Sequence, residues 1–239
     1  MKSYVINKND AGQRLDKFIS KAVPALPKNL MYKYIRLKRI KLNKKRCEIS
    51  DRQCEGDVLE LYINDEFFDI SGGGESEFLK VSDKINVIYE DENILLVNKP
   101  CGLVVHEDDE NSQDTLINRI KKYLYTMGEY DPESEASFAP SLCNRLDRNT
   151  QGIVICAKNA ESLRILNSAV KFRMIDKRYL CVTVGEPKPK ETVLHAFLVK
   201  KESENRVYVY DHEVLGSKSI VTGYKVLKTC GELSLCEIE

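Results

Sequence analysis

An aspartate between two arginines is the most chemically suggestive feature of this 239-residue sequence. Asp147 lies within residues 144–152, Asn-Arg-Leu-Asp-Arg-Asn-Thr-Gln-Gly, and an apolar run follows directly at 153–157. Free aspartate has a pKa of about 3.9, and neighbouring guanidinium groups favour the charged form of a carboxyl group. The apolar run predicts a buried strand, and a loop at a strand end holds reactive side chains against a rigid scaffold. The stretch therefore predicts an ionised carboxylate that is available for chemistry.

This stretch resembles the catalytic motif of the RluA-type RNA pseudouridine synthases, Arg-Leu-Asp-x-x-Thr-x-Gly before an apolar strand that ends in Ala-Lys. Here the strand ends in Ala157-Lys158, and Gln151 stands where serine is commonest. The resemblance implies that the enzyme breaks the N-glycosidic bond of a uridine and rejoins the turned base through carbon. It makes Asp147 the catalytic residue, either as a nucleophile at the anomeric carbon or as a base for the adjacent sugar proton. The alternative is a carboxylate that only stabilises a turn.

The family resemblance assigns roles to two more side chains. A uridine inside folded RNA must leave its stack before it reacts, and Arg145 matches the family arginine that fills the vacated space. The alternative for this arginine is an ion pair with Asp147 or with a phosphate. Segment 177–185 resembles the second family motif, Lys-x-Tyr-x-x-x-x-x-Gly, whose tyrosine packs against the target base. That tyrosine is Tyr179 here, and the alternative for it is an ordinary core aromatic.

Other motif positions are expected to shape the fold. Thr150 and Gly152 are expected to fix the tight turn before the strand at 153–157. Segment 98–106, Asn-Lys-Pro-Cys-Gly-Leu-Val-Val-His, resembles another family segment, and we expect its role to be mainly architectural.

A block of basic residues marks a second functional surface, although the chain as a whole has 37 basic and 37 acidic residues and no net charge. The block contains no acidic residue, and such a local concentration of positive charge is typical of nucleic-acid binding. The alternative is a solvated helix face. The members of the block are Lys28, Lys33, Arg36, Lys38, Arg39, Lys41, Lys44, Lys45 and Arg46.

The block lies in a segment that resembles the S4-type RNA-binding domain. A helix is expected from residue 14, with apolar positions 15, 18 and 19, and a second helix is expected after Pro27, with Leu30, Tyr34 and Leu37 on its apolar face. Strands are expected at 40–43 and 54–61. The resemblance implies that Arg14 and the basic block contact RNA phosphates, which supply affinity rather than sequence specificity.

The sequence predicts the α+β class: a small α/β S4-like domain, then a mixed, mainly antiparallel β-sheet catalytic domain with flanking helices. The expected parts are an RNA-binding domain at 1–63, an acidic, glycine-rich linker at 64–82 and a catalytic domain at 83–239. The linker is expected to let the small domain swing. In the catalytic domain strands are expected at 85–89, 94–98, 153–158, 179–184, 207–210 and 221–227, with helices at 115–125 and after an N-cap at Asn159.

Several classes of protein are excluded by composition and spacing. No run approaches the roughly 20 apolar residues of a membrane span, and the N-terminus lacks the apolar core of a secretory signal. The eight cysteines include no Cys-x-x-Cys pair, and three of them, Cys143, Cys156 and Cys181, have apolar neighbours, so we expect neither disulfides nor a metal. The reaction that the resemblance implies takes place within one nucleotide and requires no cofactor, which fits the absence of a dinucleotide or phosphate-binding glycine motif. A cytoplasmic monomer that acts on RNA is the prediction.

The end of the sequence departs from the family pattern. The family continues past a Thr-x-Tyr strand, here Thr222-Gly223-Tyr224, into a basic segment whose arginine pairs with the catalytic aspartate. The sequence ends at Glu239, about where that segment begins, so we expect a C-terminally incomplete catalytic domain.

Large-subunit ribosomal RNA is the expected substrate, and Ala157-Lys158 favours the RluA type over the related RsuA type. A non-catalytic, ribosome-associated or structured-RNA-binding protein remains the alternative. A glycosidase is disfavoured because no second well-placed carboxylate is evident.

Overall fold

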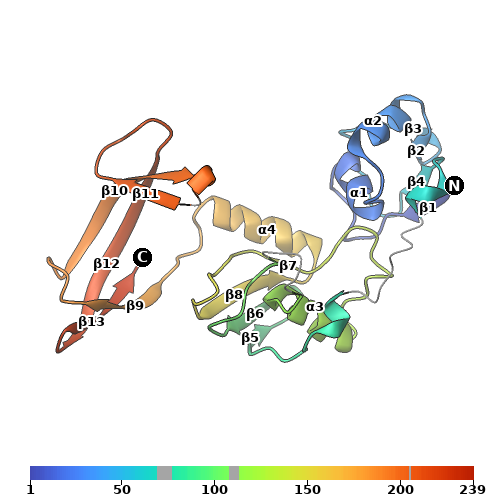
Figure 1. Cartoon of the computed structure of the whole chain (residues 1–239). Helices are drawn as coiled ribbons and strands as arrows, with labels where there is room; N and C mark the ends of the chain where they lie inside the picture. Colours follow the sequence, from blue (N-terminus) through green and yellow to red (C-terminus); the bar gives the residue numbers. More distant parts are fainter. Residues whose placement is uncertain (69–76, 108–112, 205) are drawn as a thin grey trace. The chain divides into compact units, whose positions relative to one another are not determined.

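The computed structural model describes residues 1–68, 77–107, 113–204 and 206–239. These residues form two compact units, a first unit at 1–172 and a second unit at 173–239. The described chain consists of antiparallel sheets with a few helices, which confirms the predicted α+β class (Figure 1).

Residues 1–63 of the first unit, here called the N-terminal module, form a four-stranded antiparallel sheet with two helices packed on it (Figure 1). The strand order is β1-β4-β2-β3. Its elements are β1 (Lys2–Val5), α1 (Leu15–Ala22), α2 (Lys28–Arg36), β2 (Ile40–Leu42), β3 (Lys45–Arg46) and β4 (Val58–Leu61). Helix α1 buries Leu15, Phe18 and Ile19, the spacing that places side chains on one helical face, as predicted.

The buried face of α2 differs from the predicted one. The helix buries Met31, Tyr34 and Ile35, whereas Leu37 is exposed. The reason is the end of the helix: α2 stops at Arg36, and Lys38 turns the chain away with a φ of 60°.

The described ends of the predicted linker at 64–82 are ordered against the rest of the first unit. Phe67 packs on the core of the N-terminal module, and Phe78 is buried with its ring 5.9 Å from that of Tyr130. The Ser-Gly-Gly-Gly-Glu-Ser part of the predicted linker lies in 69–76, outside the described residues. Two short 3-10 helices lie in these ends, η1 (Asp65–Phe67) and η2 (Glu77–Lys80).

Residues 77–172, here called the central module, form a second antiparallel sheet in the order β5-β6-β8-β7. Its elements are β5 (Val87–Glu90), β6 (Ile94–Lys99), α3 (Leu116–Thr126), β7 (Ser141–Leu142), β8 (Gly152–Ala157) and α4 (Ala160–Lys171). Helix α3 packs Leu116, Ile120 and Leu124 on the sheet, and burial of each such side chain stabilises the fold by about 1.5–3 kcal/mol. The predicted N-cap of α4 is confirmed, because the Asn159 side chain accepts a hydrogen bond from the Ser162 amide at 2.8 Å.

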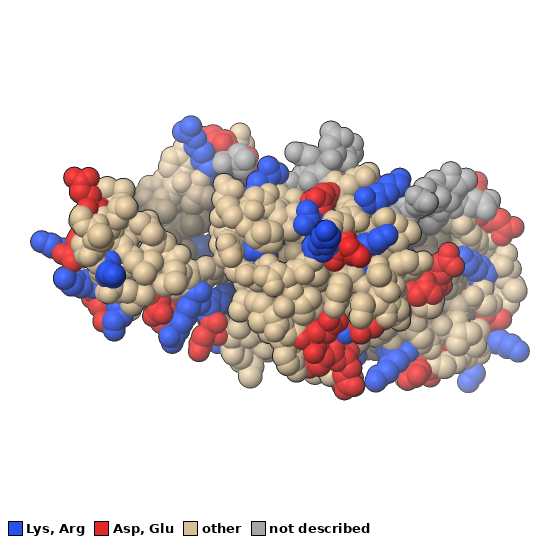
Figure 2. Space-filling view, turned by 90° about the horizontal axis from the view of Figure 1, so that it is seen from below, with Lys and Arg blue, Asp and Glu red and all other residues tan. Residues whose placement is uncertain are grey.

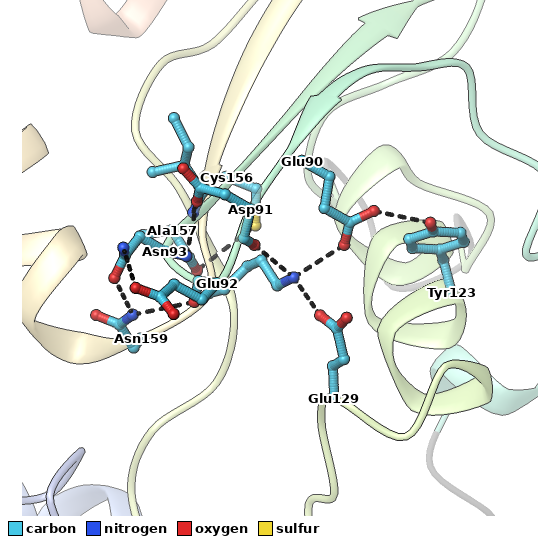
Figure 3. A network of polar contacts seen from close by, with 11 residues as sticks. Glu90, Asp91, Glu92, Asn93, Tyr123, Glu129, Cys156, Ala157 and Asn159 are labelled. Carbon is cyan, nitrogen blue, oxygen red and sulfur yellow. Dashed lines mark hydrogen bonds and ion pairs between the residues drawn. The ribbon is translucent and has the colours of Figure 1, made fainter.

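Lys158, directly after β8, ties three parts of the central module together (Figure 3). Its ammonium group lies 2.9 Å from Glu90 Oε1, donates to the Asp91 carbonyl at 2.7 Å and forms an ion pair with Glu129. The Tyr123 hydroxyl of α3 donates to the second oxygen of Glu90 at 2.8 Å. The network therefore joins the end of β8 to β5 and to the loop after α3.

Hydrogen bonds also join the two modules of the first unit. Asn9 Nδ2 donates to Glu135 at 2.7 Å, and the Ser137 hydroxyl donates to Asp10 Oδ1 at 2.6 Å. Gln13 Nε2 donates to Ser137 Oγ at 2.5 Å. The loop before β7 is thus attached to the N-terminal module.

The second unit is a five-stranded antiparallel sheet in the order β11-β10-β12-β13-β9. Its elements are β9 (Tyr179–Val184), β10 (Glu191–Lys201), η3 (Glu202–Glu204), β11 (Arg206–Tyr210), β12 (Lys218–Cys230) and β13 (Leu233–Ile238). Among the described residues of this unit only Ser234 and Cys236 are buried. Strands β10 and β13 were not predicted. Over the described ranges of the whole chain, no helix combines the length and apolar character that crossing a membrane requires.

Candidate active site

Asp147 lies in the loop between β7 and β8, and its side chain is exposed. The Thr150 amide donates to the Asp147 carbonyl at 3.0 Å, which closes a turn around the aspartate. Gly152 then opens β8 with a φ of 147°, which L side chains rarely adopt. A Cβ at this position would also lie 3.6 Å from the Leu146 side chain. Thr150 and Gly152 therefore shape the backbone on the C-terminal side of Asp147.

Asn144 fixes the other side of the loop by extending the ladder between β7 and β8 with its side chain. Its Oδ1 accepts a hydrogen bond from the Ile155 amide at 2.8 Å, and its Nδ2 donates to the Ile153 carbonyl at 3.1 Å. The amide side chain thus takes the place of a backbone partner, three residues before Asp147. Asn144 belongs to the sequence motif, but the motif alone does not predict this role for its side chain.

A buried lysine holds the loop from the adjacent strand. Lys99, at the end of β6, is fully buried and donates to the carbonyls of Pro100 at 2.9 Å, Leu103 at 2.7 Å and Arg148 at 3.0 Å. Burial lowers the pKa of Lys99, while the charges of Cys101 and Asp147 oppose that shift. The charge of the Asp147 carboxylate therefore acts on the Lys99 ammonium group, which donates to the carbonyl of the next residue, Arg148.

Two more contacts connect the loop after β6 to the Asp147 loop. The Gly102 amide donates to the Arg148 carbonyl at 2.8 Å, so this carbonyl accepts from both Lys99 and Gly102. The Cys101 thiol donates to the Asn149 carbonyl at 3.3 Å. The family resemblance of segment 98–106 does not indicate that Lys99 contacts a residue 49 positions later.

The charged neighbours of Asp147 do not pair with it. Arg145 and Arg148 are both exposed, and among the residues that the structure describes no ion pair joins either guanidinium group to the Asp147 carboxylate. The carboxylate and both guanidinium groups are therefore accessible to a ligand.

Tyr179 belongs to the second unit, whereas Asp147 belongs to the first. It is the first residue of β9, its Cα pairs with that of Ile238 in β13, and it is 40% exposed. The strand ends at Val184, and Gly185 follows with a φ of 80° and donates its amide to the Glu232 carbonyl at 2.6 Å. The second motif thus spans one complete strand and the turn after it, with the tyrosine at the first position of the strand.

The basic block lies on α2 and on the hairpin of β2 and β3. Eight of its nine side chains are exposed, Lys41 is half-buried, and within the described part of the chain none forms an ion pair. Arg14 differs, because it pairs with Asp16 at 3.0 Å, and its hydrogen bonds lower the pKa of that carboxyl group. In Figure 2 basic and acidic side chains are interspersed over the face shown.

One cysteine contacts the Asp147 loop, because the Cys101 thiol donates to the Asn149 carbonyl. All eight are free thiols, and Cys47, Cys143, Cys156 and Cys236 are buried. Burial raises the pKa of Cys47 to about 11 and that of Cys156 to about 12, so both thiols stay protonated and unreactive. No cluster of three or more His, Cys, Asp or Glu side chains that could hold a metal ion occurs in the described residues.

Comparison with known proteins gives two family matches. The RNA pseudouridylate synthase family matches residues 93–239, and the S4 domain matches residues 13–59. In a solved structure, Human RNA Pseudouridylate Synthase Domain Containing 4, the same fold recurs with a TM-score of 0.50 and 20% identity, over 64% of this chain and 57% of that one.

Curated relatives include proteins of Mycoplasma and Rickettsia. An uncharacterized RNA pseudouridine synthase of Mycoplasma capricolum is 38% identical over 77% of this chain and 59% of its own length. Ribosomal large subunit pseudouridine synthase C of Rickettsia bellii is 32% identical over 90% of this chain and 70% of its own length. The chain therefore spans less than two thirds of the Mycoplasma capricolum protein.

Proposed function

The chain belongs to the RNA pseudouridylate synthase family, and from this premise we propose that it isomerises specific uridines in RNA to pseudouridine. We propose large-subunit ribosomal RNA as the substrate, because relatives from Rickettsia and Vibrio carry the name ribosomal large subunit pseudouridine synthase C. The S4 domain match at residues 13–59 supports an RNA partner. The enzyme is proposed to act as a monomer in the cytoplasm.

Asp147 is the proposed catalytic residue. The bond between uracil N1 and the sugar breaks, and a bond between C5 and the same sugar carbon forms. C5 loses its proton and N1 gains one, so the composition of the nucleotide is unchanged and no co-reactant is consumed. Asp147 either attacks the anomeric carbon or removes the adjacent sugar proton. The observation that carries this proposal is the Asp147 loop itself: an exposed carboxylate on a backbone that Asn144, Lys99 and Gly102 hold in place. A preset position lowers the barrier because less motion must be frozen at the transition state.

Arg145 and Tyr179 are proposed to act on the target uridine and on the stack that it leaves. The exposed guanidinium group of Arg145 can enter the stack that the flipped uridine leaves, since its planar cation both stacks and donates hydrogen bonds. The partly exposed ring of Tyr179 can pack against the flipped uracil. The unpaired cations of the basic block are proposed to bind RNA phosphates.

The assignment is tested in cells. We expect that deletion of the gene removes one or more pseudouridines from large-subunit ribosomal RNA, as mapped by carbodiimide labelling and primer extension. Expression of the intact gene product should restore the lost pseudouridines. Its Asp147→Asn variant should form them at less than about one hundredth of the parent rate.

An exposed aspartate outside the site supplies the matched control. Asp83→Asn makes the same change of charge in the first unit and should restore modification fully. Unchanged pseudouridine maps after deletion, together with retained binding of the protein to ribosomal RNA, would support a non-catalytic RNA-binding protein instead.

A further inference from the structure

A groove lined by cations runs along the contact between the two modules of the first unit. Two adjoining hollows of about 240 Å³ and 620 Å³ form it, and they share Lys21, Ser137, Phe138 and Leu163 in their walls. We call it the cationic groove. Its cations are Arg14, Lys17, Lys21, Arg52, Lys121 and Arg164.

The N-terminal module supplies one wall. Lys17 and Lys21 are one helical turn apart on the exposed side of α1, opposite its buried apolar face. Arg52 lies beside Arg14 through an isolated β-bridge, and its guanidinium group donates to the Gly12 carbonyl at 2.5 Å. The cations of this wall are therefore held by a helix and by backbone hydrogen bonds.

The central module supplies the other wall. Arg164, in the second turn of α4, donates to the Ala11 carbonyl at 3.2 Å and so reaches across to the N-terminal module. The α4 backbone is tied in the same way, because the Ala160 amide donates to Asn9 Oδ1 at 3.2 Å. Together with the Gln13–Ser137 hydrogen bond, these contacts mean that the groove exists only while the two modules are docked.

Among the described residues that line the groove, cations outnumber carboxylates. Glu107 is the one carboxylate among these described residues, and its Oε1 already accepts from Asn118 at 2.8 Å. The nearby Asp16 is bound by both nitrogens of the Arg14 fork at 3.0 Å. Across the described ranges, the other five cations of the groove form no ion pair. Such a concentration of like charge stores repulsion that a bound polyanion relieves.

Resting on the proposed RNA substrate, we infer that the cationic groove binds the sugar-phosphate backbone of that RNA, at a site separate from the basic block on α2. Guanidinium and ammonium groups are the side chains that recognise phosphate oxygens. The groove shares no residue with the basic block, so RNA held at both places contacts the N-terminal module on α1 as well as on α2. RNA binding in the groove also depends on the docking of the two modules, because Arg164 comes from α4 in the central module.

The test compares two doubly substituted forms of the intact protein. Lys17→Gln/Lys21→Gln removes two groove cations, and Lys8→Gln/Lys80→Gln removes two exposed lysines that do not line the groove. Binding of a large-subunit ribosomal RNA fragment is measured against salt concentration. The groove variant should bind at least about tenfold more weakly, and its slope of log K against log salt should fall by about 1.4 to 1.8, the value for two lost phosphate contacts.

The control variant should keep the affinity and the salt slope of the parent protein. Equal affinities and slopes for the groove variant and the control would overturn the inference. Arg164→Gln provides a second test from the opposite wall and should lower the slope by about 0.7 to 0.9. Thermal melting of each variant identifies any loss of folding. Because the readout is binding, failure of pseudouridine formation alone would count against the proposed function and leave the groove result intact.

Discussion

At the scale of single residues, Asp147 is fixed through its backbone and left accessible at its carboxylate. Asn144 holds the loop to β8 on one side, and Lys99 with Gly102 holds the Arg148 carbonyl on the other. These contacts form when the protein folds, so the free energy of positioning is supplied before RNA binds. Lys99 is a positioning residue in this account, since it acts on Asp147 through the neighbouring backbone.

Replacement of Lys99 by methionine tests this role. The substitution keeps the apolar stem but removes the Lys99 hydrogen bonds to the carbonyls of Pro100, Leu103 and Arg148, of which the last keeps the Gly102 amide as a donor. Unfolding in urea should therefore show a loss of about 2 kcal/mol or more. The turnover number should fall while the RNA dissociation constant stays the same, because the loop moves and the RNA surface does not. Lys84→Met, at an exposed lysine, should change neither the free energy of unfolding nor the turnover number. A destabilised but fully active Lys99→Met enzyme would show that Lys99 stabilises the fold without positioning Asp147.

Sequence reasoning found Asp147 but not the side chains that hold it, for a physical reason. An acid between arginines at a strand start is visible in one short segment. The contact of Lys99 with Arg148 depends on the pairing register of β6 and β8, in which Lys99 is opposite Gly152. Register is set by packing over the whole sheet, so a single segment does not reveal it.

At the scale of elements, charged and polar contacts place the ends of the strands. Lys158 is the clearest case, because one ammonium group binds Glu90, Glu129 and the Asp91 carbonyl (Figure 3). Burial lowers the pKa of Lys158, but the hydrogen bonds with Glu129 and Glu90 outweigh it, so the net shift is upward. This end of β8 is opposite to the end that follows the Asp147 loop, so the network supports the sheet and not the site.

Lys158→Met should therefore lower the free energy of unfolding by about 2 kcal/mol, less than a fully buried pair costs because Glu129 is partly exposed. Since the folded pKa is raised, the contribution of this lysine is complete below its unfolded pKa of about 10.4 and is lost as pH rises through the folded pKa. Urea unfolding at pH 7 and above pH 10.4 measures both effects. The control Tyr123→Phe removes a single hydrogen bond to Glu90 and should cost about 0.5–1.5 kcal/mol. Equal stability of Lys158→Met and the parent protein at pH 7 would contradict this role.

The elements were predicted best where burial follows a regular period. Helix α1 buries three residues at helical spacing and was expected. Strand β13 was missed because its two buried side chains, Ser234 and Cys236, are small and give a weak alternating signal. Strand β10 was also missed. None of its residues is buried, so its place in the sheet depends on pairing with β11 and β12 and not on alternating burial along its own sequence.

At the scale of the whole molecule, a chain without net charge carries two separate cationic surfaces. The basic block could be predicted from the sequence because its residues all lie within one segment, 28–46. The cationic groove was not, because its cations come from four segments that only the folded first unit brings together. Both surfaces and Asp147 belong to the first unit, and Tyr179 belongs to the second. The proposed phosphate-binding cations and the proposed catalytic aspartate therefore all lie in the first unit.

Quantification of nucleosides after reaction in vitro tests whether the Asp147 carboxylate is needed to isomerise uridine. The purified intact gene product is incubated with a uridine-containing transcript of large-subunit ribosomal RNA, and the nucleosides are then quantified by liquid chromatography and mass spectrometry. We expect pseudouridine in proportion to enzyme and time, less than about one hundredth of the parent rate from Asp147→Asn, and the parent yield from Asp83→Asn. Equal pseudouridine from the parent protein and Asp147→Asn would contradict this expectation.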